Sequence, residues 1–270
     1  MKKQPTTISR SPPYYHLLPY LTAVAVSLVL FAPDEAPTGK GLALKCLPIV
    51  LLGLHLKVIE GSGQGEAKWV YRALQFSVVG DAFLVWPDQF FLQGILFFAV
   101  AQILYVKAFG FRDVSIGLGA IPLFGLSLVA LVLILPGLPT PLRVAVPFYA
   151  LIITTMLWRA VDRARLRTDL SIERRMSSLL GAVTFVISDL SIVTLQVGQL
   201  IPHTYAQLII LSTYYLAQLF LVLGSFESFW ERRVATPKKQ TKEKKQMREK
   251  EKKEKEKKEK GKEKEKKKRK

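Results

Sequence analysis

Eight apolar stretches occupy most of residues 14–226 and constrain the fold more than any other feature. They lie at residues 14–32, 40–58, 68–87, 89–111, 114–135, 141–158, 176–198 and 204–226. A bilayer core of ~30 Å requires about 20 apolar residues per helix, so each stretch is long enough or nearly long enough to cross it. The connections are short and leave no room for a soluble domain. The sequence therefore predicts an all-α polytopic membrane protein with about eight transmembrane helices.

A short segment and a long tail flank this membrane domain at residues 14–226. Residues 1–13 form the N-terminal segment, and residues 227–270 form a tail rich in Lys and Glu. Residues 238–270 carry a net charge of +12 out of +18 for the whole chain. The Lys/Glu alternation has no apolar face, so we expect a disordered tail. Its charge predicts contact with anionic lipid head groups, whereas the small charge of the body gives no sign of specific nucleic-acid binding.

The basic residues alternate between the two sides of the predicted spans. One side carries Lys2, Lys3, Arg10, Lys57, Lys68, Lys107, Arg112, Arg159, Arg163, Arg165, Arg167, Arg174, Arg175 and the tail. The other side has little besides Lys40 and Arg143. Because cytosolic connections carry the excess of Lys and Arg, this pattern predicts a multi-pass protein with both termini in the cytosol.

The sequence lacks the residue patterns of several common catalytic and metal-binding sites. Cys46 is the one cysteine in the chain, so neither a disulfide nor a thiolate zinc cluster can form within it. His16, His55 and His203 have no metal-ligand spacing, and no nucleophile elbow or phosphate-binding loop appears. We therefore expect no metal and no other cofactor.

Two aspartates lie inside apolar spans, where a charge is costly. Asp81 lies in QFSVVGDAFLVW and Asp189 in TFVISDLSIVT. Each lies thirteen residues from the predicted cytosolic start of its span, at Lys68 and Met176, which places both carboxyl groups ~20 Å deep. Acids inside membrane spans are rare and usually functional, so the equal depth predicts one shared site. The alternative is that each acid is neutral and only hydrogen-bonded between helices.

Further polar residues lie inside the spans. Lys45 in the second span is either the electrostatic partner of the aspartates or a side chain that extends to the membrane interface. The fourth and eighth spans add Gln102, Tyr105, Tyr214, Tyr215 and Gln218. An aspartate-bearing span precedes a span with aromatic and polar groups in both halves, which predicts a four-plus-four internal repeat.

Five motifs resemble one known family. They are Lys45-Cys-Leu-Pro-Ile, Phe76-Ser-Val-Val-Gly-Asp-Ala, Gly94-Ile-Leu-Phe-Phe-Ala-Val-Ala-Gln-Ile-Leu-Tyr, Phe185-Val-Ile-Ser-Asp and Ser212-Thr-Tyr-Tyr-Leu-Ala-Gln. Their order resembles that of the YhhN-like membrane proteins, whose animal members are the lysoplasmalogenases. The resemblance covers roughly residues 17–226 and excludes the tail.

The resemblance implies a hydrolase of the endoplasmic reticulum membrane that acts on a lysophospholipid. It would cleave the vinyl ether bond of lysoplasmalogens and release a fatty aldehyde and glycerophosphocholine or glycerophosphoethanolamine. The residues to which the resemblance points are Lys45, Asp81, Tyr105, Asp189, Tyr214, Tyr215 and Gln218. Our hypothesis is that Asp81 and Asp189 are the catalytic pair, and that the substrate-binding or tuning residues are Lys45, Gln102, Tyr105, Tyr214, Tyr215 and Gln218. Paired carboxyl groups suit this reaction, because one can donate a proton while the other stabilises a cation and activates water.

Gln102 departs from the family pattern, which usually has His at this position. Glutamine forms hydrogen bonds but cannot shuttle a proton near neutral pH. If that His is catalytic in the family, this protein is slow, altered in substrate or inactive. Two alternatives therefore stay open, a membrane transporter and an inactive lipid-binding relative, both built on the same aspartate pair.

Overall fold

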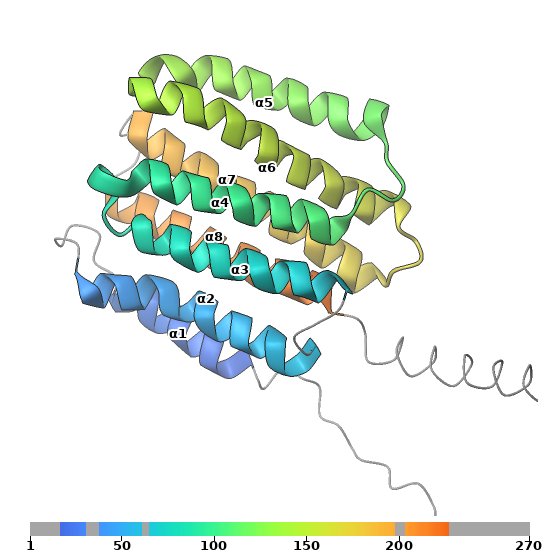
Figure 1. Ribbon diagram of the computed structural model, residues 1–270, viewed down its shortest axis with the longest axis horizontal. Coiled ribbons are helices and arrows are strands. Elements are labelled where there is room, and N and C mark those ends of the chain that lie inside the picture. Colours follow the sequence, from blue (N-terminus) through green and yellow to red (C-terminus); the bar gives the residue numbers. More distant parts are fainter. Residues whose placement is uncertain (1–16, 31–37, 61–64, 198–202, 227–270) are drawn as a thin grey trace, which may run out of the picture. The chain divides into compact units, whose positions relative to one another are not determined.

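Apolar helices account for nearly all of the chain that the computed structural model describes, which is residues 17–30, 38–60, 65–197 and 203–226. The α-helices are α1 (Leu18–Leu30), α2 (Gly39–Glu60), α3 (Gly65–Phe83), α4 (Pro87–Phe109), α5 (Ile121–Ile134), α6 (Thr140–Leu166), α7 (Ile172–Val197) and α8 (His203–Ser225). They pack as a bundle of roughly parallel rods (Figure 1). No strand occurs in these described ranges, and the all-α prediction is confirmed.

Within the described ranges, six helical segments are long and apolar enough to cross a membrane: α2, α4, α6, α7, α8 and Ile116–Gly137, which contains α5. The chain is thus a multi-pass membrane protein. Helix α1 is a shorter apolar helix, and α3 carries four charged residues. Eight crossings are compatible with this set. The N-terminal segment, the tail and both termini lie outside the described residues.

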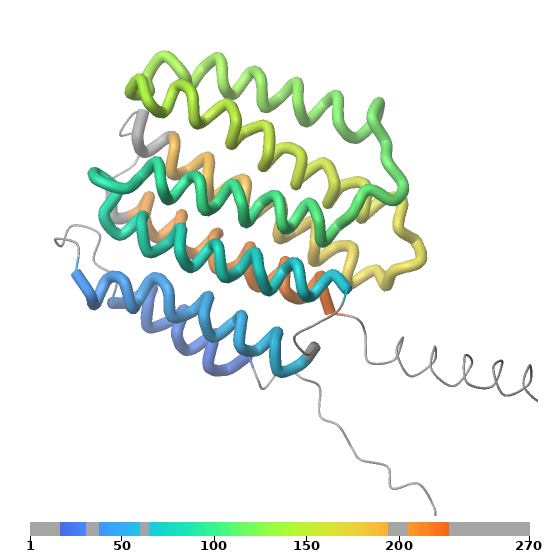
Figure 2. Tube along the Cα trace, in the orientation of Figure 1, coloured from blue at the N-terminus to red at the C-terminus, as the bar shows by residue number. Residues whose placement is uncertain are grey.

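The tube in Figure 2 shows how the helices of the bundle run beside one another. In the α3–α4 and α7–α8 hairpins, glycines let the two helices approach closely. A Cβ atom on Gly80 would lie 2.8 Å from the Phe98 ring, and one on Gly94 would lie 2.6 Å from the Leu84 side chain. In the second hairpin, a Cβ atom on Gly181 would lie 2.8 Å from the backbone nitrogen of Leu221. Small residues at helix contacts favour tight packing where lipid offers no hydrophobic driving force. Both hairpins are built alike, and the four-plus-four repeat stays a prediction.

Helix α2 is held against α8 at a proline. Pro48 lies inside α2 and has no N–H, so the carbonyl of Leu44 loses its helical partner. The Tyr215 hydroxyl of α8 donates to the carbonyl oxygens of Leu44 at 3.5 Å and Lys45 at 3.2 Å. The hydroxyls of Ser27 and Tyr215 lie 2.9 Å apart, which adds α1 to the same contact. Tyr215 therefore joins α8 to α1 and α2.

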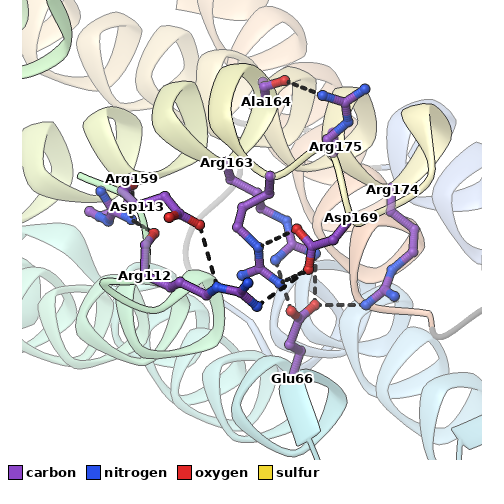
Figure 3. A network of polar contacts seen from close by, with 10 residues as sticks. Glu66, Arg112, Asp113, Arg159, Arg163, Ala164, Asp169, Arg174 and Arg175 are labelled. Atoms are coloured by element: carbon purple, nitrogen blue, oxygen red, sulfur yellow. Dashed lines mark hydrogen bonds and ion pairs between the residues drawn. The ribbon is translucent and has the colours of Figure 1, made fainter. Parts of the chain in front are cut away.

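A network of arginines and acids joins four helices at one end of the bundle (Figure 3). We call Glu66, Arg159, Asp162, Arg163 and Arg174 the arginine end. The Glu66 carboxylate of α3 accepts bonds of 2.9 and 2.7 Å from Arg163 of α6 and one of 2.8 Å from Arg174 of α7. Arg163 also donates to the Gly224 carbonyl of α8 at 3.1 Å. Arg159 and Asp162, both fully buried in α6, form an ion pair of 2.6 Å.

An ion pair between the half-buried Arg167 and the exposed Asp169 lies in the connection that follows α6. Arg167 donates two hydrogen bonds to the Asp169 carboxylate, at 2.8 and 2.9 Å. These bonds favour the charged form of the carboxylate and lower the pKa of Asp169 to about 2. Because the Asp169 carboxylate is exposed to solvent, we expect this pair to matter less for stability than the arginine end.

Candidate active site

The Asp81 carboxyl group is enclosed by three helices. It belongs to α3, is 1% exposed, and accepts a hydrogen bond of 2.6 Å from the Tyr214 hydroxyl of α8. Lys45 of α2 is close enough to act on Asp81 electrostatically, although the two form no ion pair within 4.0 Å. The Lys45 ammonium donates to the Leu84 carbonyl at 3.4 Å, just beyond the last residue of α3. The free carbonyls at a helix C-terminus favour a cation there, which holds Lys45 near Asp81.

The Asp189 carboxyl group lies on α7 and has a different environment. It accepts a short hydrogen bond from the Tyr149 hydroxyl of α6. The charge of Asp81 also acts on it, so the two carboxyl groups are within electrostatic reach of each other. Among the described residues, no basic side chain forms an ion pair with Asp189. The two aspartates therefore share one region of the bundle but differ in their charged neighbours.

Aromatic rings line the core around the two aspartates. The Phe185 ring centroid lies 5.7 Å from that of Tyr214, 6.2 Å from that of Phe98 and 6.3 Å from that of Tyr105. These rings meet edge to face, which is a favourable geometry for aromatic pairs. Tyr214, whose hydroxyl bonds to Asp81, belongs to this group of rings, so Asp81 lies beside apolar surface, and such surroundings strengthen electrostatic interactions.

A chain of hydrogen bonds fixes the next layer of polar side chains. The Tyr105 hydroxyl donates to Gln218 at 2.5 Å, and the Gln218 amide donates to the Ser77 hydroxyl at 3.1 Å. Ser77 lies one helical turn before Asp81 on α3. Through these bonds, Tyr105 and Gln218 connect α4 and α8 to α3, one helical turn from Asp81.

Gln102 stands out because its amide is buried without a partner. The residue is fully buried on α4, and neither its Nε2 nor its Oε1 atom has a hydrogen-bond partner in the described part of the chain. The amide lies close enough to the Tyr149 hydroxyl to interact with it, although no pair of atoms between them has the geometry of a full hydrogen bond. An unpaired buried polar group costs about 1–3 kcal/mol, so each such group in a folded protein needs an explanation. The Gln102 amide is thus available to a polar atom of a bound molecule.

The structure brings most of the residues predicted from the sequence to this region. Asp81 and Asp189 supply the two carboxyl groups, and Lys45 and Tyr214 lie next to that of Asp81. Gln102 lies beside Tyr149. Tyr105 and Gln218 form the neighbouring chain of hydrogen bonds that ends at Ser77. Tyr215 bonds instead to α1 and α2, although it neighbours Tyr214 in the sequence, because successive residues point about 100° apart on a helix.

Tyr149 was missed by sequence reasoning. It is a tyrosine nine residues into an otherwise apolar span, shortly after Pro147, and that depth is the one signal that could have indicated it. The described residues include no group of three or more His, Cys, Asp or Glu side chains placed to hold a metal ion. What the arrangement offers is two carboxyl groups, each bonded to a tyrosine hydroxyl, in apolar surroundings. Such groups can donate and accept protons.

Comparison of the sequence with known proteins identifies the family to which the chain belongs. The YhhN family model matches residues 41–225. The lysoplasmalogenase TMEM86B of Sus scrofa is 35% identical over 218 residues, which cover 78% of this chain and 87% of that protein. The lysoplasmalogenase TMEM86A of Homo sapiens is 35% identical over 217 residues, with coverage of 78% and 89%. No solved structure matches. The two aspartates and their partners all lie within the matched residues, and the chain belongs to the YhhN family.

Proposed function

We propose that this protein is a lysoplasmalogenase, a membrane hydrolase that cleaves the vinyl ether bond of lysoplasmalogens. The products would be a fatty aldehyde and glycerophosphocholine or glycerophosphoethanolamine. The observation that carries the proposal is the pair of tyrosine-bonded aspartates in the bundle core. The sequence identity to proteins named lysoplasmalogenase supports the choice of substrate.

The reaction suits a pair of carboxyl groups. A vinyl ether is hydrolysed by proton transfer to its β-carbon, which produces an oxocarbenium ion that water then captures. One group must be a proton donor and the other an anion close to the developing positive charge, as in glycosidases that form a related cation. The electrostatic interaction between Asp81 and Asp189 and the tyrosine hydrogen bond to each support this assignment of roles to the pair. The apolar helix faces would receive the hydrocarbon chain of the substrate.

Gln102 has a place in this reaction despite its departure from the family pattern. Its unpaired amide can donate to the ether oxygen or accept a hydrogen bond from the attacking water. Neither role requires a proton shuttle. We therefore propose that the protein is active with glutamine at this position.

The proposed function also implies a cellular location and a topology for the protein. We place the protein in the endoplasmic reticulum membrane with both termini in the cytosol and the basic tail, residues 227–270, near anionic lipid head groups. The described residues all belong to one unit, Met1–Phe226, which supports a separate membrane domain. Tags at each terminus of the full-length protein would test the topology, since both should bind antibody after selective permeabilisation of the plasma membrane.

The function is tested by aldehyde release from a choline lysoplasmalogen with purified full-length protein in detergent. The matched control substrate is the saturated alkyl ether, which cannot form the oxocarbenium ion by protonation. Release from the vinyl ether alone is the expected result. Release that requires Gln102→His would support an inactive relative, and no release from either folded protein would favour transport or lipid binding.

A further inference from the structure

We infer that the two aspartates have fixed and different roles, with Asp189 as the proton donor, Asp81 as the anion and Tyr149 as the residue that positions Asp189. This inference rests on the proposed vinyl ether hydrolysis. It arises from the unequal surroundings of two carboxyl groups that the sequence presents as equivalent.

Asp81 has the surroundings of an anion. Lys45 lies within electrostatic reach on α2, and Tyr214 donates a hydrogen bond of 2.6 Å from α8. A cation and a hydrogen-bond donor both favour the ionised form of a carboxyl group. The hydrogen bond to the Leu84 carbonyl, just after the end of α3, holds the Lys45 side chain near Asp81.

Asp189 has the surroundings of an acid. Its charged neighbour is Asp81, whose negative charge opposes a second negative charge nearby. Tyr149 occupies one of its oxygens through the hydrogen bond and leaves the other to carry the proton. As the proton leaves, the same hydroxyl stabilises the carboxylate that forms, so it acts most strongly in the transition state.

These roles close a complete proton cycle with water as the second reactant. Asp189 gives its proton to the β-carbon, and the ether becomes an oxocarbenium ion beside the Asp81 carboxylate. Water attacks the α-carbon and gives one proton to Asp81, which leaves a hemiacetal. The hemiacetal hydroxyl then returns a proton to Asp189, the carbon–oxygen bond breaks, and the leaving alcohol takes its proton from Asp81. Both aspartates end in their starting states.

Other titratable groups around the pair are neutral hydroxyls or a thiol. Those that act on Asp81 besides Lys45, Tyr214 and Asp189 are Cys46 of α2, Tyr105 of α4 and Tyr215 of α8. Asp189 faces Tyr149 of α6 in addition to Asp81. Lys45 is therefore the basic group that distinguishes the two aspartates among the described residues.

The test is the pH dependence of kcat/KM for the full-length enzyme in detergent, with a choline lysoplasmalogen whose charge is constant over the pH range. The profile should be bell-shaped, with its ascending limb set by the anion and its descending limb by the acid. Lys45→Met removes support for the anion, so the ascending limb should move to higher pH while the descending limb stays. Tyr149→Phe removes support for the ionised acid, so the descending limb should move to higher pH, with a loss of ten-fold or more in kcat.

Tyr214→Phe provides a second probe of the anion, since it should move the same limb as Lys45→Met. The opposite pattern, with Lys45→Met on the descending limb and Tyr149→Phe on the ascending limb, would overturn the assignment and leave hydrolysis intact. Limbs that stay in place in all three variants would overturn it as well. A wild-type protein that folds but releases no aldehyde would overturn the proposed function itself.

Discussion

The arginine end and the aspartate pair are both polar regions within an apolar bundle, and they differ in how their charges are matched. At the arginine end, Glu66 takes three hydrogen bonds from two arginines, and Arg159 pairs directly with Asp162. In the aspartate pair, each carboxyl group is bonded to a neutral tyrosine hydroxyl, and neither forms an ion pair within 4.0 Å. Both regions connect several helices, so their place in the bundle does not by itself show which one serves stability and which one serves catalysis.

The difference in matching indicates a difference in role. Ion pairs that satisfy one another hold helices together, and a change in either partner leaves a buried charge without compensation. A carboxyl group bonded to a neutral hydroxyl can keep its hydrogen bond in both protonation states. We therefore expect the arginine end to determine stability and the aspartate pair to determine turnover.

The largest expected effect is on turnover at the aspartate pair. Asp81→Asn and Asp189→Asn keep the size of the side chain but remove the proton chemistry, so each should lower kcat by about 10²–10⁴-fold. Thermal unfolding in detergent should be nearly unchanged, because asparagine can still accept the tyrosine hydrogen bond. A variant that keeps near-normal turnover would contradict the pairing of the two acids.

At the arginine end we expect the reverse, a large effect on stability and a small effect on turnover. Glu66→Gln leaves Arg163 and Arg174 without a counter-charge and should cost about 3 kcal/mol of unfolding free energy. Turnover per folded molecule should stay within about two-fold of the wild type, since no part of this network touches the aspartates. Denaturant unfolding in detergent measures the first effect. Glu173→Gln, an exposed acid on α7, is the matched control and should change stability little.

Two adjacent tyrosines sharpen the same comparison on one helix. Tyr214→Phe removes the hydroxyl bonded to Asp81 and should lower kcat by about ten-fold or more, because a hydrogen bond to a charged group contributes about 1.5–3 kcal/mol. Tyr215→Phe removes contacts to α1 and α2 and should cost about 1 kcal/mol of stability with little change in kcat. Equal effects of the two changes on kcat would argue against the distinction.

The smallest effect is expected at the Arg167–Asp169 pair, whose carboxylate is exposed to solvent. The pKa of Asp169 is lowered to about 2, below the value of about 3.9 for an unfolded chain. Its contribution to stability is therefore present above about pH 4 and is lost as the pH falls toward 2. Asp169→Asn should leave unfolding at pH 7 almost unchanged and reduce the pH dependence below pH 4. A large loss at pH 7 would show that the pair is part of the arginine end.

Much of the fold could be predicted from the sequence, because membrane spans are set by long apolar runs that are easily recognised. Helix ends were less certain. The sixth apolar run ends at residue 158, whereas α6 continues to Leu166, because Arg159, Asp162 and Arg163 find buried partners at the arginine end. Such partners come from helices distant in sequence, so hydropathy does not indicate them.

The candidate site was predicted in part for a similar reason. Asp81, Asp189 and Lys45 are conspicuous because charges inside spans are rare. Tyr149 is not, since tyrosines are common near span ends, and its bond to Asp189 joins residues 40 positions apart. The separate directions of Tyr214 and Tyr215 depend on how α8 is rotated in the bundle, and the sequence does not reveal that rotation.

The most direct test of proton transfer from a buried aspartate to carbon is hydrolysis in D₂O. The aldehyde should be trapped as it forms and analysed by mass spectrometry. The account predicts one deuterium on the carbon next to the aldehyde carbon, a slower reaction than in H₂O, and a loss of labelled product with Asp81→Asn or Asp189→Asn that matches the loss of kcat. Aldehyde released without deuterium at that carbon would contradict it.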